Sequence, residues 1–128
     1  MSKFIKFKTV TKNVDFMSID SIFLVTNNFV YYTYGDQNAS LIINEDTYFD
    51  IANQISTLDD GWVDVRDYVA DKNEMSHLLV REKSIKGIVV GNSNKYELKL
   101  EHNHLPAEIA VTAMTEEDAE GLIDYLSK

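Results

Sequence analysis

The stretch "NEDTYFDIANQIS", Asn44 to Ser56, has the pattern of an amphipathic helix. Asn44 is suited to cap it, because an asparagine side chain accepts a hydrogen bond from a free N–H group of the first turn. Two acids follow, where the helix dipole favours negative charge. Apolar residues then recur at the spacing of a buried helix face, at Tyr48, Ile51, Ala52 and Ile55. We expect a helix that begins after Asn44 and ends near Leu58.

The stretch "TEEDAEGLIDYLS", Thr115 to Ser127, repeats this pattern near the end of the chain. Thr115 takes the place of the cap, and three acids follow it. The apolar face is formed by Ala119, Leu122, Ile123 and Leu126. A second helix of the same construction is therefore predicted.

Short stretches rich in β-forming residues precede each helix. Before the first helix they are Phe4 to Val10, Ser21 to Val25, Phe29 to Gly35 and Ala39 to Ile43. Before the second helix they are Trp62 to Val69, Ser84 to Val90, Lys95 to Glu101 and Ala107 to Val111. The same order of elements is thus expected in both halves of the chain.

Matching positions in the two halves stand at similar separations. The pairs Phe4 and Trp62, Ser21 and Ser84, Asn28 and Asn94, Leu41 and Ile109, and Asn44 and Thr115 are 58, 63, 66, 68 and 71 residues apart. The separation grows where turns fall, as in a duplicated unit whose loops have lengthened, although a strand-rich unit can show similar periodicity by chance. The expected fold is α+β, with two similar antiparallel β-meander-plus-helix units, residues 1–58 and 59–128, packed as one compact domain.

Residues 62–82 fit a second interpretation. Trp62, Val65, Tyr68 and Val69 also fall at helical spacing, so this segment is either a strand or a helix. We predict a strand.

The composition restricts the classes of function. The chain has 128 residues, a formal net charge of −9 and no cysteine, so thiolate metal sites and disulfides are ruled out. No apolar run approaches the length of about 20 residues that spans a bilayer, and the first residues lack the apolar run of a signal peptide. We therefore expect a cytoplasmic protein that does not enter a membrane. Nucleic-acid binding is disfavoured because a polyanion would be repelled, although the first four charged residues are all lysines, Lys3, Lys6, Lys8 and Lys12.

The segment "EHNHLP", Glu101 to Pro106, raises the question of a metal site. His102 and His104 would share a face if a strand continued through them, and could then bind a metal together. Asn103 and Pro106 are typical of a turn, however, and the segment stands where the first half has the turn "GDQN". We expect a hairpin loop and no bound metal.

Other catalytic patterns are missing from the sequence. It has no Gly-x-Ser-x-Gly motif and no glycine-rich phosphate loop before a helix. Its paired acids are explained by helix starts and loops. We expect a protein that is not an enzyme and uses no cofactor.

The stretch "SIDSIFLVTNN" followed by "VYYTYG" resembles the LytTR-type DNA-binding domain over about a quarter of the chain. That family reads DNA with basic loops after its helix, which would imply basic residues at "TLDDGWVDVRD". This segment is acidic here, so no residue role is carried over from the family.

The clearest candidate for a binding surface comes from the contrast between two matching strands. In "KYELKLE" one face is apolar and the other is charged, the pattern of a half-exposed strand. In "FVYYTYG" the inner face is Val30, Tyr32 and Tyr34, while the outer face is Phe29, Tyr31 and Thr33. Aromatic residues replace charges on this outer face, so it is either covered by the rest of the fold or offered to a partner.

The predicted function is a non-enzymatic protein–protein interaction module that binds a protein partner or associates with itself. An alternative from the net charge is an acidic decoy that binds a basic nucleic-acid-binding protein. A further alternative is a metal enzyme that depends on His102 and His104.

Overall fold

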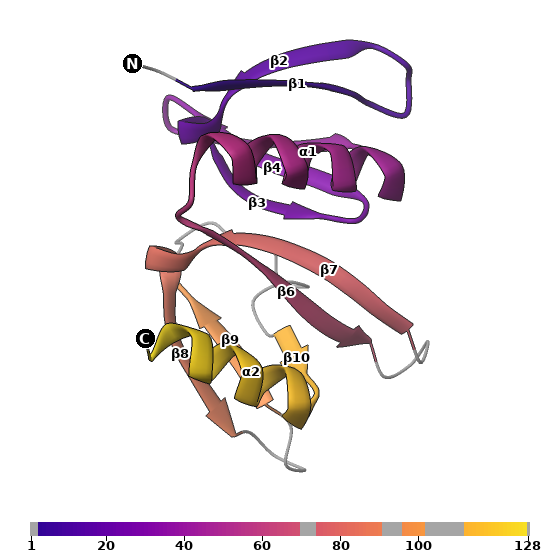
Figure 1. The fold of residues 1–128 in the computed structure, drawn as a ribbon. Coiled ribbons are helices and arrows are strands. Elements are labelled where there is room, and N and C mark those ends of the chain that lie inside the picture. The colour runs from indigo at the N-terminus through magenta and orange to yellow at the C-terminus, as the bar shows by residue number, and fades with distance from the viewer. Residues whose placement is uncertain (1–2, 70–73, 91–95, 102–111, 128) are drawn as a thin grey trace. The chain divides into compact units, whose positions relative to one another are not determined.

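The computed structural model describes residues 3–69, 74–90, 96–101 and 112–127, and it has mixed α and β structure (Figure 1). The chain forms two compact units. The first unit consists of residues 1–64 and 78–81, and the second of residues 65–77 and 82–128. The sequence predicts two repeats that meet at residue 58. Repeats and compact units are different kinds of division, so the two predicted repeats stay a prediction.

Strands β1 (Phe4–Lys8) and β2 (Val14–Ser18) form a two-stranded antiparallel ribbon at the start of the first unit. A 3-10 turn, η1 (Ile19–Ser21), leads from the ribbon into β3 (Ile22–Thr26), β4 (Phe29–Tyr34) and β5 (Gln37–Ile42). Strands β6 (Trp62–Val69) and β7 (Glu74–Arg81) complete a sheet with the order β5-β4-β3-β7-β6, in which β3 pairs antiparallel with both neighbours.

Helix α1 (Glu45–Leu58) carries much of the core of the first unit. Its buried face, Tyr48, Ile51 and Ile55, packs in one cluster with Val25 and Val30 of the sheet. The inward residues of β1 belong to the same cluster, and Figure 1 shows α1 alongside the ribbon. One helix thus joins the two sheets of this unit.

The second unit contains the 3-10 turn η2 (Glu82–Ser84), the strands β8 (Ile85–Val90), β9 (Tyr96–Leu100) and β10 (Thr112–Met114), and helix α2 (Glu116–Leu126). The strands form an antiparallel sheet in the order β10-β9-β8. Leu98 of β9 and Ala119 and Leu122 of α2 are buried.

Both helix predictions are confirmed, caps included. The side chain of Asn44 accepts a 2.9 Å hydrogen bond from the backbone N–H of Thr47, and that of Thr115 accepts one of 3.2 Å from Asp118. The prediction of a strand for residues 62–69 is also confirmed. The strand expected at Ala107 to Val111 lies outside the described residues.

Three of the described strands were not predicted from the sequence: β2, β7 and β10, which begins one residue after the end of a predicted strand. The predicted first strand extended to Val10, but β1 ends at Lys8, and Lys12 in the following turn has a positive φ of 66°. This backbone conformation is unfavourable for most side chains and suits a tight reversal. The chain therefore turns back after Lys8 and forms β2 from Val14, before the next predicted strand at Ser21.

The described elements of residues 4–58 and of residues 62–126 follow the same order: two strands, a 3-10 turn, three strands and a helix. The pairing of the strands differs, however. The ribbon β1–β2 forms a sheet of its own, whereas β7 pairs with β3 of the first unit. No helix in the described part of the chain is long and apolar enough to cross a membrane.

Removing either cap tests the assignment of the helix starts. We expect Asn44→Ala and Thr115→Ala each to lower the free energy of unfolding by about 1 kcal/mol, because each leaves an N–H group of the first turn without its acceptor. Urea denaturation followed by circular dichroism measures the change. The control is Asn53→Ala at an exposed position inside α1, where alanine should be neutral or slightly stabilising. Cap variants that match this control would contradict the assignment.

Candidate interaction surface

The outer face of the β1–β2 ribbon exposes large apolar side chains. Successive residues of a strand point to opposite faces, so burial of Ile5 and Phe7 turns the alternate residues of β1 outward. On this outer face Phe4 is 43% exposed, Val14 53% and Phe16 68%. Regular strands, not loops, hold these side chains, so the surface has a defined shape.

Two of these side chains form a stacked aromatic pair. The rings of Phe4 and Phe16 lie 4.8 Å apart between centroids, with only 7° between their planes. In the register of the ribbon Phe16 lies opposite Lys6, so Phe4 is its diagonal neighbour on the same face. Mutual stacking fixes both rings in place while leaving Phe16 largely open to solvent.

Lysines are the only charged residues among the outward positions of the ribbon. These positions are Phe4, Lys6, Lys8, Val14, Phe16 and Ser18. The acid of β2, Asp15, lies opposite Phe7 in the register and therefore belongs to the other face. The exposed Lys3 and Lys12 add positive charge near the two ends of β1. This face is locally basic on a chain with a net charge of −9.

A glutamine of α1 holds the free edge of β1. The backbone N–H of Lys6 donates to Oε1 of Gln54 over 3.1 Å, and Nε2 of Gln54 donates to the backbone carbonyl of Lys6 over 2.7 Å. The side-chain amide thus makes the two bonds that a neighbouring strand would make. Nε2 also donates to Asp50 over 3.1 Å, which orients the amide. This contact protects the edge of the ribbon and ties it to the helix.

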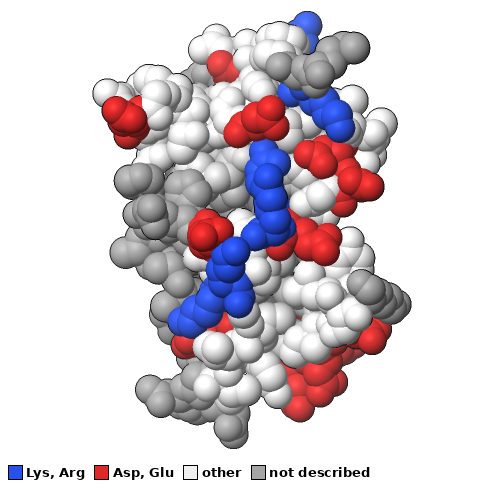
Figure 2. All heavy atoms as spheres, turned by 90° about the vertical axis from the view of Figure 1, so that its left-hand side faces the viewer, with Lys and Arg blue, Asp and Glu red and all other residues white. Residues whose placement is uncertain are grey.

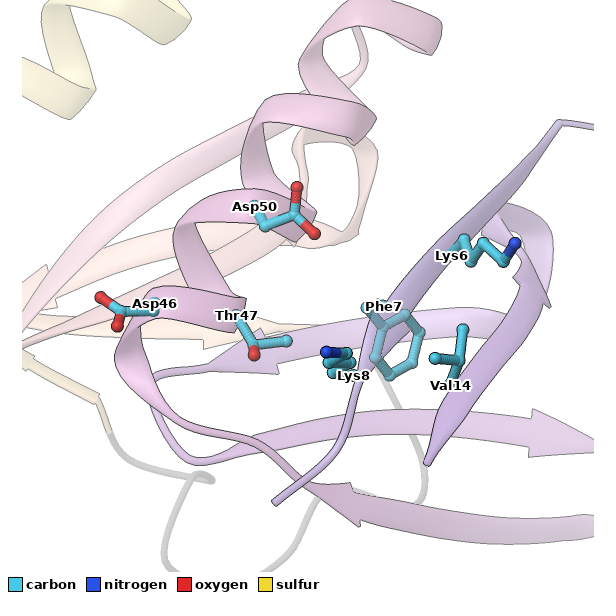
Figure 3. A pocket seen from close by; sticks show the side chains of 7 residues that line it. All are labelled: Lys6, Phe7, Lys8, Val14, Asp46, Thr47 and Asp50. Carbon is cyan, nitrogen blue, oxygen red and sulfur yellow. The ribbon is translucent and has the colours of Figure 1, made fainter. Parts of the chain in front are cut away.

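A shallow hollow of about 480 Å³ lies between the ribbon and the start of α1 (Figure 3). Its walls are formed by Lys6, Phe7, Lys8, Val14, Asp46, Thr47 and Asp50. The lysines come from β1 and the aspartates from the helix, so the hollow presents both signs of charge around an apolar floor. It is continuous with the outer face of the ribbon through Lys6, Lys8 and Val14, which belong to both.

The structure places the sequence-predicted candidates Phe29, Tyr31 and Thr33 on β4. Tyr31 is only 8% exposed, and its ring lies 5.6 Å from that of Phe29 and 6.1 Å from that of Phe23. Phe29 and Thr33 are half-buried. These three residues expose much less apolar surface than the outer face of the ribbon, which the sequence reasoning did not single out.

The signal for the ribbon face was present in the sequence. The alternation in "FIKFK" places Phe4, Lys6 and Lys8 on one side and Ile5 and Phe7 on the other. What could not be seen was which side faces the core, since both sides contain a phenylalanine. The answer depends on the contact with α1. The bond between Lys6 and Gln54 shows that this contact joins residues 48 positions apart in the chain.

Arg81 joins three segments at the other end of the first unit. Its Nη2 donates to the carbonyl of Ile19 over 2.6 Å, and its guanidinium lies 4.5 Å from the centre of the Trp62 ring. Nη1 lies 3.9 Å from Oδ2 of Asp59. Asp59 in turn accepts hydrogen bonds from the backbone N–H of Gly61 at 2.9 Å and from Nε1 of Trp62 at 3.3 Å. These contacts connect β7 with η1, Trp62 of β6 and the segment that follows α1.

Two titratable groups of this unit have perturbed pKa values. The hydrogen bond from the backbone of Gly61 is the main cause that lowers the pKa of Asp59, with smaller contributions from Trp62, Lys3 and Arg81. Burial raises the pKa of Tyr48 far above its usual value, and Asp64, whose Oδ1 accepts a 3.0 Å hydrogen bond from the Tyr48 hydroxyl, raises it further. A buried tyrosine hydroxyl that stays protonated acts as a fixed donor, not as a general base.

Metal coordination finds no support in the described part of the chain, where no group of three or more His, Asp or Glu side chains gathers. His102 and His104 lie outside the described residues.

On the face seen in Figure 2, basic side chains lie beside acidic ones, so charges of opposite sign are interspersed there.

Searches with this chain for a matching protein-family model, curated protein or solved structure found none. Its function must therefore be argued from the residues and their geometry.

The pKa of Asp59 leads to a test of the Arg81 cluster. A carboxyl whose pKa is lower in the folded state stabilises the fold above its unfolded pKa of about 4, and this contribution is lost as the pH falls through the folded value. We expect Asp59→Asn to lower the free energy of unfolding at pH 7 by about 1 kcal/mol. The wild-type advantage should shrink as the pH is lowered below about 4. Urea denaturation over a pH series measures this, and parallel pH profiles for the two proteins would contradict it.

Proposed function

We propose that this chain is a non-enzymatic protein–protein interaction module and that its contact surface is the outer face of the β1–β2 ribbon. The observation that carries the proposal is the exposure of Phe16, at 68%, in a stacked pair with Phe4 on a regular strand surface. Strand faces that meet only water are normally polar. Aromatic residues are enriched in the cores of protein interfaces.

The surroundings of the phenylalanine pair fit this role. Lys6 lies opposite Phe16 and Lys8 opposite Val14, so positive charge lies directly beside the exposed apolar side chains. The patch is small, which suits a weak or transient contact more than a permanent one. Gln54 holds the ribbon against α1, so little ordering is needed when a partner binds.

The face predicted from the sequence, Phe29, Tyr31 and Thr33, stays a weaker proposal. Burial of Tyr31 means that a partner could reach only the edges of this group. The ribbon offers three exposed apolar side chains instead and is therefore the better supported surface.

The acidic decoy is less well supported. This alternative rests on the net charge of −9. A protein that imitates nucleic acid should present a continuous acidic surface to the basic protein that it binds. Interspersed charges on the face in Figure 2 favour the interaction module. A metal enzyme would depend on His102 and His104, and no described residue adds support for it. A cytoplasmic location belongs to the same proposal.

We further infer that the two halves arose by duplication. The shared order of elements supports this, together with helix caps at Asn44 and Thr115, 71 residues apart. The 3-10 turns end at Ser21 and Ser84, 63 residues apart, which is the separation found in the sequence. In this interpretation, the strand pairing of one half changed after the duplication.

Site-specific photo-crosslinking tests the proposed surface. A benzophenone amino acid is placed at Phe16 or, as the control, at Phe49, which is also an exposed phenylalanine of the first unit at 46%. After irradiation in the cells that naturally produce the chain, position 16 should give a discrete protein adduct and position 49 should not. Equal labelling at both positions, or no adduct at position 16, would contradict the proposal.

A further inference from the structure

We propose that the ribbon face of one copy of this chain binds helix α2 of a second copy. This inference rests on the proposed function and names the partner of the same surface. It follows from a match in charge, apolar character and spacing between two exposed surfaces, one in each unit of the chain.

Helix α2 has an exposed face that is both acidic and apolar. Glu116 and Glu120 are one helical turn apart, and Ile123 follows three residues after Glu120, so all three lie on the same side. Both glutamates are exposed, and Ile123, predicted on the apolar face with Ala119 and Leu122, is 44% exposed while those two are buried, so it lies at the edge of that face. The helix contains no lysine or arginine.

The ribbon presents the complementary pattern. Lys6 and Lys8 project from the same face of β1, with Phe16 opposite Lys6. Residues two apart on a strand are about 6.6 Å apart, and residues four apart on a helix rise by about 6 Å. Glu116 and Glu120 therefore have the spacing needed to meet Lys6 and Lys8 at the same time. Ile123 then lies on the side where the ribbon offers its apolar residues.

Helix α1 of a second copy is a less suitable partner for the ribbon face than α2, even though α1 also begins with acidic residues. Its Asp46 and Asp50 line the hollow beside Lys6 and Lys8 of their own copy, and Asp50 accepts a hydrogen bond from Gln54. The acids of α1 thus already contribute to the surroundings of the ribbon lysines. Glu116 and Glu120 belong to the other unit.

Two copies with a charge of −9 each repel one another at long range. Salt screens this repulsion over about 8 Å at physiological ionic strength, whereas the apolar contact between Ile123 and the phenylalanines does not depend on it. Adding moderate salt should therefore strengthen self-association, because it screens the long-range repulsion. High salt should weaken it again, because the lysine–glutamate contacts are screened as well.

Sedimentation velocity on the purified chain over a concentration series tests the proposal. The wild type should associate reversibly, and Lys6→Glu/Lys8→Glu should raise the dissociation constant by about tenfold or more, because two attractive contacts become repulsive. Lys83→Glu/Lys86→Glu is the matched control, with the same change in net charge at exposed positions of the second unit. Thermal melts verify that each variant is folded, and Lys6→Gln/Lys8→Gln replaces the reversal if it is not.

Mixing charge-reversed proteins identifies the two surfaces. Glu116→Lys/Glu120→Lys should also lose association alone, while the exposed Asp36→Lys/Asp60→Lys should keep it. An equimolar mixture of Lys6→Glu/Lys8→Glu with Glu116→Lys/Glu120→Lys should recover a complex, since glutamates of one ribbon then meet lysines of the other α2. Failure of the mixture to associate overturns the inference.

A wild type that stays monomeric at every concentration also overturns the inference. The proposed function would survive that result if Phe16 still crosslinked to a different protein in cells, so the two failures can be told apart. Binding of a single-stranded oligonucleotide or of anionic phosphatidylserine vesicles that is lost in Lys6→Glu/Lys8→Glu, without self-association, would instead assign the ribbon to a nucleic acid or a membrane.

Discussion

Burial of Ile5 and Phe7 is the contact on which the first unit depends. Both side chains pack into the cluster formed by α1 and the β3–β4 strands, and this is how a separate two-stranded ribbon becomes part of the fold. An isolated ribbon of this kind is marginally stable in water, so it needs this apolar contact. Because side chains alternate along a strand, the same burial directs Phe4, Lys6 and Lys8 to the solvent. A shift of one residue in the register would bury the lysines and expose the core residues.

The proposed contact surface is thus a consequence of core packing. The ribbon cannot bury Phe4 and Phe16 without exposing Ile5 and Phe7. Gln54 strengthens the arrangement by pairing with the backbone of Lys6 as a strand would, which also blocks edge-to-edge pairing at that point. A strand surface on which lysines lie beside exposed apolar side chains is well suited to an acidic partner with an apolar side chain.

Local signals in the sequence predicted the helices and most strands. Asn44 and Thr115 are correct caps because capping depends only on residues within one turn. Strand β2, "VDFMS", was missed because the turn before it depends on a left-handed Lys12, a conformation that lysine does not signal. The pairing of β3 with β7 joins Val25 to Leu79 across 54 residues, and no local pattern specifies such a partner. For the same reason the sequence left the face of Phe29, Tyr31 and Thr33 either covered by the fold or offered to a partner, and only the structure shows that Tyr31 is 8% exposed.

The central claim is that the outer face of the ribbon binds a second copy of this chain. Nuclear magnetic resonance of the protein with ¹³C-labelled phenylalanine rings tests it directly, because Phe4, Phe16 and Phe49 report from two exposed surfaces of one unit. On going from dilute to concentrated protein, the account predicts shifts and broadening of the Phe4 and Phe16 signals while those of Phe49 stay in place. Unchanged ribbon signals, or changes at Phe49 alone, would contradict it.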